Sequence, residues 1–210
     1  LANIREVDAI IHVVRCFAND NVIHVDGSVD PVRDKEIIDL ELQLKDLESL
    51  EKQLQKAQKN TKGGNKEALR ECEFLQKAID HLQEGKNIRT MVCSEEEKKL
   101  LSEYLLLTDK SVLYVCNVDE GSLPDGNKWV EMVRNAVKDE NAQVLVICAA
   151  VEEQISALSD PKERAEFMEM MNIQESGLSR LIRSAYQLLG LQTYFTAGVK
   201  EVRAWTITSQ

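Results

Sequence analysis

Several features that would assign this 210-residue sequence to a class directly are missing. No apolar run approaches the roughly 20 residues that a membrane-spanning helix needs, which argues against a membrane protein. No cationic start followed by an apolar stretch is present, so no secretory signal is visible. This second absence has little weight, because the sequence does not start with Met and begins as if within a helix. We expect the natural N-terminus to lie upstream of Leu1.

Cysteine and histidine patterns typical of disulfide frameworks or metal sites are also lacking. The five cysteines form no C-x-x-C pair, and the three histidines are scattered singly: Cys16, Cys72, Cys93, Cys116, Cys148, His12, His24 and His81. Three of the cysteines lie within or at the end of apolar, strand-like runs. Cysteines used in this way are typical of reduced core residues in a cytoplasmic protein, and we expect no metal site.

The charge is acidic overall, with a formal net value of −10. This argues against a protein that is basic over its whole surface, although it leaves room for a local basic patch. Hydrophobic residues make up 43% of the sequence and charged residues 30%, as in a soluble protein. The length allows one sizeable core, or one core with a smaller appendage.

Three short segments, residues 9–14, 111–116 and 143–148, are β-branched and almost continuously apolar. This pattern is typical of parallel strands that are covered on both faces. Amphipathic helices are expected around them, at residues 94–107, 125–140, 160–171 and 176–190. Alternating strands and helices predict an α/β core of three layers, with residues 125–140 crossing between the second and third strands.

The interval between the first two strands is far too long for one crossover helix. Apolar residues recur in steps of three and four from Ile37 to Ala57 and, after "TKGGN", from Leu69 to Leu82. Two such stripes joined by a Gly-Gly turn predict an antiparallel helical hairpin over residues 34–86. Because the first stripe is narrow and flanked by charges, we favour a projecting coiled-coil arm. Helices packed on the main core remain the alternative.

The character of the sequence changes again after Gly190. The stretches "LQTYFTAG" and "EVRAWTIT" are β-branched and aromatic, which predicts a β-hairpin. Two strands alone are only marginally stable in water, so we expect residues 191–210 to begin a second domain.

Polar and small residues follow two of the predicted strands. Asn117, Asp119 and Glu120 come directly after the second strand, and "CAAVEE" ends the third. In open α/β sheets ligands bind beyond the carboxyl ends of the strands. An Asn can donate to a purine ring nitrogen, and a carboxylate can accept from N–H groups on the edge of a base. A nucleotide base is therefore one interpretation, and an ordinary turn is the other.

Four stretches together resemble the YchF/Obg-like ATPase family of P-loop NTPases: "LANIREVDAIIHVVRCF", "HVDGSVDPVRD", "NVDE" and "LQTYFTAGVKEVRAWTI". The resemblance covers the whole chain, and the last two stretches are highly specific. It implies the C-terminal half of an α/β nucleotide-binding domain at residues 1–33 and 87–190, with a coiled-coil insertion at 34–86. Residues 191–210 would begin a β-rich TGS domain, a module associated with RNA and ribosome binding.

Within this resemblance, "NVDE" occupies the base-specificity motif that reads N-K-x-D in most relatives. Asn117 matches the Asn, Val118 replaces the Lys whose stem covers the base, and Glu120 replaces the Asp. The longer Glu should no longer match the paired N–H donors of guanine, which agrees with the preference for ATP ascribed to the family. The second base-contacting loop, usually S-A-K, would consist of Cys148, Ala149 and Ala150.

The family's G-x-x-x-x-G-K-[ST] loop, its D-x-x-G loop and its catalytic His do not occur in this sequence. The resemblance implies that they lie upstream with the Mg²⁺ ligands, and we identify no catalytic residue and no metal ligand here. The parent protein would hydrolyse ATP, or GTP more weakly, on the large subunit of the ribosome, and this segment alone would be inactive. The alternative is a non-catalytic module that binds RNA or protein through the coiled-coil arm.

Charge is distributed unevenly along the predicted hairpin. Residues 34–51 contain seven acidic residues against two lysines, whereas residues 52–66 contain no acid and five lysines: Lys52, Lys56, Lys59, Lys62 and Lys66. A rigid arm with a basic end is suited to contact RNA phosphates. A solvated, lysine-rich loop is the alternative.

Overall fold

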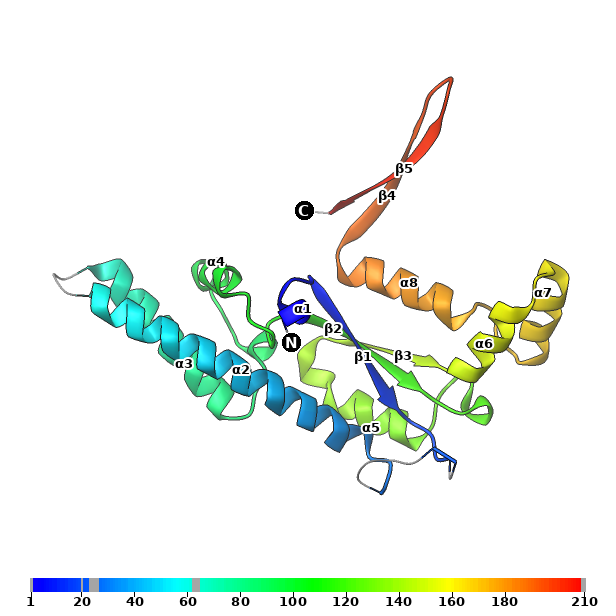
Figure 1. Ribbon diagram of the computed structural model, residues 1–210, viewed down its shortest axis with the longest axis horizontal. Coiled ribbons are helices and arrows are strands. Elements are labelled where there is room, and N and C mark those ends of the chain that lie inside the picture. The colour runs from blue at the N-terminus through cyan, green and yellow to red at the C-terminus, as the bar shows by residue number, and fades with distance from the viewer. Residues whose placement is uncertain (1, 20, 23–26, 62–64, 209–210) are drawn as a thin grey trace. The chain divides into compact units, whose positions relative to one another are not determined.

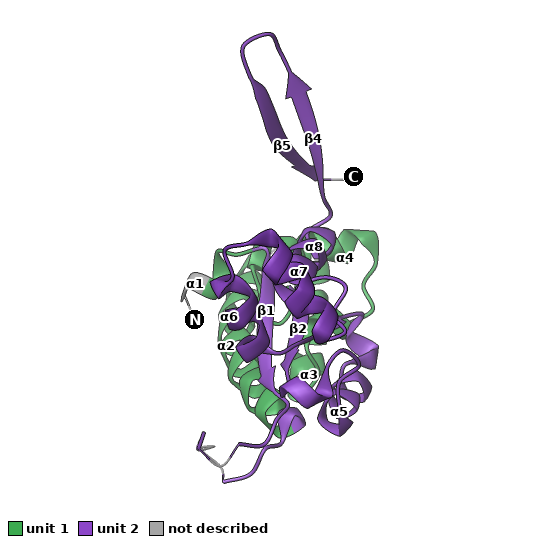
Figure 2. Cartoon of the chain, turned by 90° about the vertical axis from the view of Figure 1, so that its right-hand side faces the viewer, with its two compact units in different colours: residues 1–7, 33–110 green, residues 8–32, 111–210 purple. Residues whose placement is uncertain are grey.

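The chain divides into two compact units in a computed structural model that describes residues 2–19, 21–22, 27–61 and 65–208 (Figures 1 and 2). The helical unit comprises Leu1–Val7 and Arg33–Lys110, and the sheet unit comprises Asp8–Val32 and Ser111–Gln210.

The sheet unit contains the three predicted strands, β1 (Ala9–Arg15), β2 (Ser111–Asn117) and β3 (Gln143–Ile147). They are parallel and adjacent in the order β1-β2-β3, and Val115 lies opposite both Val13 and Leu145. The expected α/β class with a parallel sheet is therefore confirmed. In this register the carboxyl ends of all three strands lie at one edge of the sheet, which is where the polar residues of the sequence occur.

Helices cover the sheet on two sides (Figure 1). The sheet unit contains α5 (Lys128–Ala136), α6 (Ala149–Ala157), α7 (Pro161–Met170), α8 (Gly177–Leu188) and the 3₁₀ turns η2 (Glu120–Ser122) and η3 (Lys138–Glu140). On one face, α5 and α6 pack on a cluster that includes Tyr114 and Cys116 of β2. On the other face, α8 packs on Leu113, Val115 and Ile147. This arrangement gives the three layers.

The first strand departs from the prediction that every strand is covered on both faces. Val14 is 3% exposed, but Ile11 and Val13 are 47% and 62% exposed on the opposite face. By register this is the face of Leu113 and Val115. The leucines of α8 that cover that face, Leu181 and Leu188, pack on β2 and β3. Within the described residues, the outer face of β1 therefore lacks the helix that its neighbours have.

A β-hairpin follows α8, as the sequence predicts. Strands β4 (Leu191–Ala197) and β5 (Val202–Thr208) pair antiparallel, with Tyr194 opposite Trp205. The indole N–H of Trp205 donates to Thr196 Oγ1 at 2.9 Å. Phe195 is 71% exposed on one side of the hairpin and Trp205 44% exposed on the other, so both faces of the hairpin carry uncovered aromatic surface.

The helical unit is built on two long helices, α2 (Pro31–Asn60) and α3 (Lys66–Gln83), with α1 (Ala2–Arg5), η1 (Ile88–Thr90) and α4 (Glu95–Tyr104). A capping box formed by Ser94 and Glu97 starts α4. The core joins Leu50 of α2 to Leu75 of α3, to Leu101 of α4 and to Ile88. Residues 87–110 thus pack with the helices, so this unit extends beyond the expected hairpin of residues 34–86.

The buried face of α2 is not the predicted apolar stripe in its first half. Ile37, Leu40 and Leu44 are more than half exposed. The buried positions of this half include polar side chains instead: Lys35, Asp39, Gln43 and Asp46. Each of these has a polar partner, such as the ion pair between Lys35 and Asp39 at 2.5 Å and the hydrogen bond from Gln43 Nε2 to Asn87 Oδ1 at 2.9 Å. Matched polar groups therefore decide which face of the helix is buried.

Asp46 is the most buried of these polar residues, at 0% exposure. Its carboxylate accepts hydrogen bonds from the N–H of Leu107 at 3.0 Å, the N–H of Thr108 at 2.8 Å and the Thr108 hydroxyl at 2.8 Å. Buried backbone N–H groups need a partner, and Asp46 supplies one to two successive residues. It thereby fixes the segment that leads into β2.

We predict that Asp46→Asn lowers the stability of the helical unit by about 2–4 kcal/mol, because the amide nitrogen would face donors and leave a buried N–H unsatisfied. Hydrogen exchange at the Leu107 and Thr108 amides would report the loss locally, and thermal unfolding would report it globally. Asp80→Asn is the matched control, because Asp80 is exposed and accepts one hydrogen bond, from Gln76. Equal exchange rates in the two variants would contradict this role for Asp46.

Candidate functional site

The site predicted from the sequence lies where β2 and β3 end. The side-chain Oδ1 of Asn117 accepts a hydrogen bond from the N–H of Ala149 at 3.0 Å. Next to it, the N–H of Val118 donates to the Ile147 carbonyl at 2.8 Å, and the N–H of Cys16 donates to the Asn117 carbonyl at 2.8 Å. The ends of all three strands are thus tied together around Asn117. Its Nδ2 makes no hydrogen bond to any described residue.

Two carboxylates follow, and the structure treats them differently. Asp119 accepts a hydrogen bond from the Ser122 hydroxyl at 2.6 Å, across the turn η2. Glu120 is exposed, and its carboxylate makes no hydrogen bond or ion pair within the described residues. One acidic side chain is therefore engaged, and the adjacent one is free to accept from a ligand.

The six residues expected to contact a base differ in how much of them is accessible. Ala149 and Ala150 are exposed and form the first turn of α6. Val118 and Cys148 are only 2% and 4% exposed, and their side chains belong to the core under α5 and α6. Cys148 also makes no side-chain cap to α6, which is the contact that a Ser at this position would be suited to make. Asn117 and Glu120 are thus the polar side chains that the site presents.

A pair of buried thiols lies beneath this site. Cys16 and Cys116 are both 0% exposed, and their thiols hydrogen-bond to each other. This hydrogen bond, together with burial, raises the pKa of Cys16. The same hydrogen bond from Cys16 lowers the pKa of Cys116, although burial opposes the change. All five cysteines are free thiols, and these two serve as core residues.

Two residues that the sequence analysis did not single out, Ser122 and Asn127, complete the loop after β2. Asn127 Nδ2 donates to the Cys16 carbonyl at 2.8 Å and to Ser122 Oγ at 3.0 Å. Its Oδ1 accepts from the N–H groups of Trp129 and Val130 and caps α5. The sequence offered one signal for this residue, because Asn before an amphipathic helix is a common N-cap.

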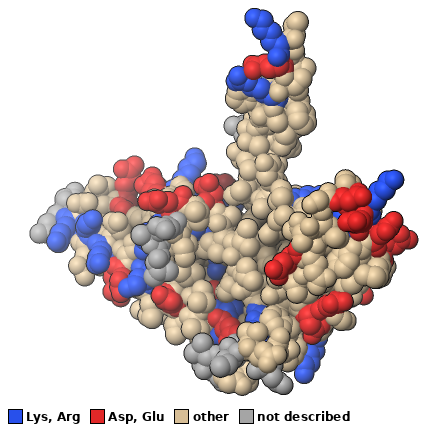
Figure 3. Space-filling view, turned by 45° about the vertical axis from the view of Figure 1, so that its right-hand side comes forward, with Lys and Arg blue, Asp and Glu red and all other residues tan. Residues whose placement is uncertain are grey.

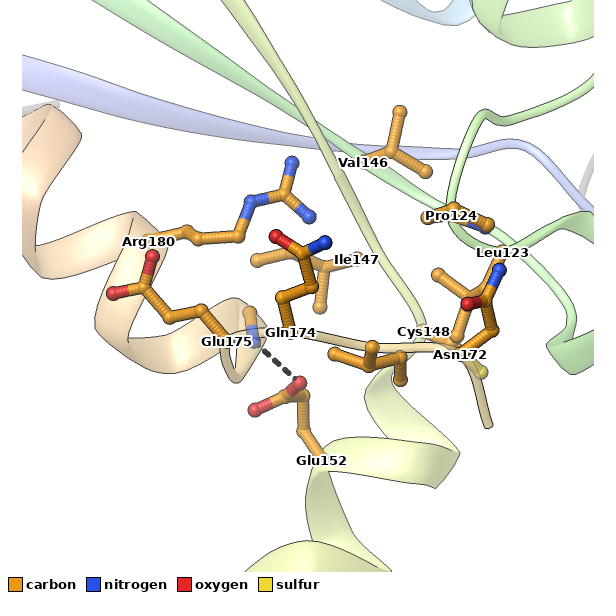
Figure 4. A pocket seen from close by; sticks show the side chains of 12 residues that line it. Leu123, Pro124, Val146, Ile147, Cys148, Glu152, Asn172, Gln174, Glu175 and Arg180 are labelled. Atoms are coloured by element: carbon orange, nitrogen blue, oxygen red, sulfur yellow. Dashed lines mark hydrogen bonds between the residues drawn. The ribbon is translucent and has the colours of Figure 1, made fainter. Parts of the chain in front are cut away.

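A pocket of about 390 Å³ lies beside the end of β3 and shares Cys148 with the base loops (Figure 4). Both carboxylates in its wall are already engaged. Glu152 accepts from the N–H groups of Gly177 at 2.6 Å and Leu178 at 3.1 Å, and Glu175 pairs with Arg183. A Cβ on Gly177 would lie 2.9 Å from Glu152 Oε1, so a larger residue would force this carboxylate to shift from the N–H groups that it accepts from. Glu152 therefore has a structural role.

The lysine-rich end of the helical hairpin is less uniformly basic than the sequence suggests. Lys52, Lys56 and Lys59 are exposed on α2, and Lys66 is exposed at the start of α3, while Lys62 lies outside the described residues. The first turns of α3 add acidic groups at the same end: Glu67, Glu71 and Glu73. Figure 3 shows Lys and Arg side chains at this end of the unit with Asp and Glu close by.

Two kinds of feature are absent from the described part of the chain. No group of three or more His, Cys, Asp or Glu residues is arranged to hold a metal ion there. None of the helices in these ranges combines the length and the apolar character needed to cross a membrane.

The two groups of the Asn117 amide can be separated by substitution. We predict that Asn117→Asp keeps the hydrogen bond from Ala149 N–H, because a carboxylate oxygen also accepts, but loses the Nδ2 donor. Asn117→Ala should lose both. Hydrogen exchange at the Ala149 amide should therefore be much faster in the Ala variant and nearly unchanged in the Asp variant. Similar acceleration in both would show that Oδ1 does not hold the two strand ends together.

Comparison with known proteins identifies relatives along nearly the whole chain. No protein-family model matches it. The "Ribosome-binding ATPase YchF" of Haemophilus influenzae is 47% identical over 208 residues, covering 99% of this chain and 57% of the relative. Proteins of the same name from Escherichia coli O157:H7 and Bacillus subtilis are also 47% identical, over 207 and 208 residues.

A solved structure agrees with these matches. The "Structure of the Schizosaccharomyces pombe YchF GTPase" superimposes with a TM-score of 0.86 at 33% identity, covering 99% of this chain and 57% of that one. The chain spans slightly more than half the length of the relatives it matches. The resemblance noted in the sequence is confirmed, and the chain is homologous over nearly all its residues to the YchF proteins.

Proposed function

We propose that the ends of β2 and β3 bind the base of a purine nucleotide, in a YchF-type P-loop NTPase of which this chain is a part. The observation that carries this proposal is the pair of free polar groups at one sheet edge. Asn117 is held by Ala149 yet keeps Nδ2 as a donor, and the carboxylate of Glu120 is exposed and without a partner among the described residues. A purine edge offers ring nitrogens that accept and amino groups that donate.

The same two groups favour adenine over guanine. Guanine presents two adjacent N–H donors, which suit the short and fixed carboxylate of an Asp. Adenine presents one amino group, which a longer and more mobile Glu can reach. Among the relatives, the curated proteins are named ATPases and the solved structure a GTPase. The choice of base is therefore the property that an experiment must decide.

The remaining parts of the reaction would be carried by residues outside this chain. The sequence contains no G-x-x-x-x-G-K-[ST] loop for the phosphates, and no described cluster of acidic residues is suited to Mg²⁺. Catalysis of phosphoryl transfer depends mainly on positioning and charge stabilisation around those groups. We therefore expect this chain to supply base recognition and, by itself, to hydrolyse no ATP. The relatives' name, "Ribosome-binding ATPase YchF", supports a parent protein that acts on the ribosome. A cytoplasmic location is part of the same proposal.

The base choice can be tested at Glu120. We predict that Glu120→Asp in the parent protein shifts the ratio of ATP to GTP affinity toward GTP by about tenfold, because one charge-assisted hydrogen bond moves by a methylene. The companion change Val118→Lys, suggested by the N-K-x-D motif, would place a charge at a position that is 2% exposed. The single substitution is therefore the cleaner test.

Calorimetric titration with both nucleotides measures this ratio. Glu153→Asp is the matched control, because Glu153 is exposed on α6 and makes no hydrogen bond or ion pair in the described part of the chain. Tighter binding of GTP than ATP by the unsubstituted protein would overturn the proposed preference.

We further propose that the parent protein contacts RNA through the lysine-rich end of the helical hairpin and through a TGS domain that begins at residue 191. Four of the five lysines are exposed and make no ion pair within the described residues, which supports the first contact. The uncovered aromatic faces of the β4–β5 hairpin support a larger domain around it. An interaction module without nucleotide chemistry is the alternative function that the lysines would also serve.

The lysine contact predicts a salt-dependent effect. Changing Lys52, Lys56, Lys59 and Lys62 to Glu should weaken association with ribosomes and flatten its salt dependence, by a log–log slope of about 0.7 for each phosphate that is no longer neutralised. Binding of ATP should be unaffected. Co-sedimentation with ribosomes over a range of salt concentrations measures both the affinity and its salt dependence.

The control carries the same change in net charge at exposed lysines outside both proposed RNA contacts: Lys99, Lys128, Lys138 and Lys162. If both quadruple variants sedimented alike at every salt concentration, the hairpin end would have no specific part in ribosome binding.

A further inference from the structure

We propose that Ser122 and Asn127 are specificity-determining positioning residues, which hold Asp119 away from the ligand so that Glu120 alone faces the base. This inference rests on the proposed function, because it concerns how the same site selects its base. It gives a role to the hydrogen bonds that connect Asn127, Ser122 and Asp119, which neither the base-specificity motif nor the fold explains.

The first step concerns two neighbouring carboxylates. Asp119 and Glu120 are adjacent and both exposed, so either could turn toward a ligand at the strand ends. The Ser122 hydroxyl donates to Asp119 Oδ1 at 2.6 Å, which is short for a neutral donor and is typical of a charge-assisted hydrogen bond. Glu120 has no comparable partner in the described ranges. The structure thus distinguishes two acids that the sequence presents as equivalent.

The second step concerns what holds Ser122 in place. Its Oγ accepts from Asn127 Nδ2 at 3.0 Å, and the same Nδ2 donates to the Cys16 carbonyl at 2.8 Å, just beyond β1. Hydrogen bonds in such a chain polarise and strengthen one another. The orientation of Asp119 therefore depends, through Ser122 and Asn127, on the backbone at the end of β1.

The backbone conformation of the loop permits this series of hydrogen bonds. The N–H of Gly126 donates to the Ser122 carbonyl at 2.7 Å, which closes the loop between them. Gly126 has a φ of +100°, and a Cβ there would lie 3.0 Å from the side chain of Val130. Only glycine adopts this conformation without strain at so close an approach. The turn closed by Gly126 places the next residue, Asn127, within hydrogen-bond distance of Ser122.

Helix capping alone does not account for Asn127. The cap of α5 uses only its Oδ1, which accepts from Trp129 and Val130. Ser or Asp would cap about equally well at this position. The Nδ2 donor, which reaches Ser122 and Cys16, is the feature that requires an amide. Asn127→Asp therefore separates the two roles, because it keeps the capping acceptor and removes the donor.

The test uses the parent protein and two ligands that differ by one amino group, ATP and purine riboside triphosphate. Their affinity ratio reports the contact between Glu120 and the adenine amino group. We expect Ser122→Ala and Asn127→Asp each to lower this ratio by about three- to tenfold, the loss that follows when one charge-assisted contact is misplaced. Ser122→Thr, which keeps the hydroxyl, should show the same affinity ratio as the unsubstituted parent.

A double-mutant cycle separates positioning from general damage to the loop. In a Glu120→Ala background, Ser122→Ala should not lower the ratio, because the contact between Glu120 and the base that a released Asp119 would disturb is already gone. An equal fall of the ratio with and without Glu120, or no fall in either background, would overturn the inference. Thermal unfolding of each variant identifies any that fail to fold, and Ser122→Ala, which leaves the α5 cap intact, then carries the test.

Failure of the proposed function would be recognised differently. If the unsubstituted parent bound neither nucleotide, or bound both ligands of the pair equally, the base site itself would be in error. If the parent discriminated between them and the Ser122 and Asn127 variants did so to the same degree, the site would stand and only the positioning role would fall.

Discussion

The hydrogen bond from the N–H of Ala149 to Asn117 Oδ1 is the interaction on which the candidate site depends. The backbone ladder between β2 and β3 ends at the pair Asn117 and Ile147. The amide side chain extends the connection by one step beyond the ladder, into the first turn of α6. Because the acceptor is used for this purpose, the orientation of the amide is fixed, and its Nδ2 donor is left without a hydrogen bond to any described residue.

The sequence predicts this part of the structure well, because the signals are local. The apolar runs identify β2 and β3, and the polar residues that end them identify the site edge. The sequence does not reveal which of Asp119 and Glu120 is engaged. That depends on Ser122 and on Asn127, whose second partner, the Cys16 carbonyl, lies 111 residues away in the chain. The burial of Val118 is likewise set by α5 and α6, which no pattern around Val118 encodes.

The long helix α2 illustrates a different limit. Hydrophobic periodicity correctly indicates a helix, but it predicts that Ile37, Leu40 and Leu44 face inward, whereas they are exposed. Burying a polar group is unfavourable only when it lacks a partner. Asn87 and Thr108 supply partners to Gln43 and Asp46 from segments 44 and 62 residues away. Periodicity therefore finds the helix, and the buried face is decided by distant hydrogen bonds.

The same principle applies within each of the two units. In each, a buried or half-buried polar side chain fixes a segment next to β2: Asp46 holds the residues just before the strand, and Asn127 and Asn117 hold those after it. The apolar body of β2 supplies rigidity but no directional information, since hydrophobic contacts are not directional. Selectivity for a base requires donors and acceptors held at defined angles. It therefore depends on the few side chains that anchor the loop, and least on the core residues that give the strand its stability.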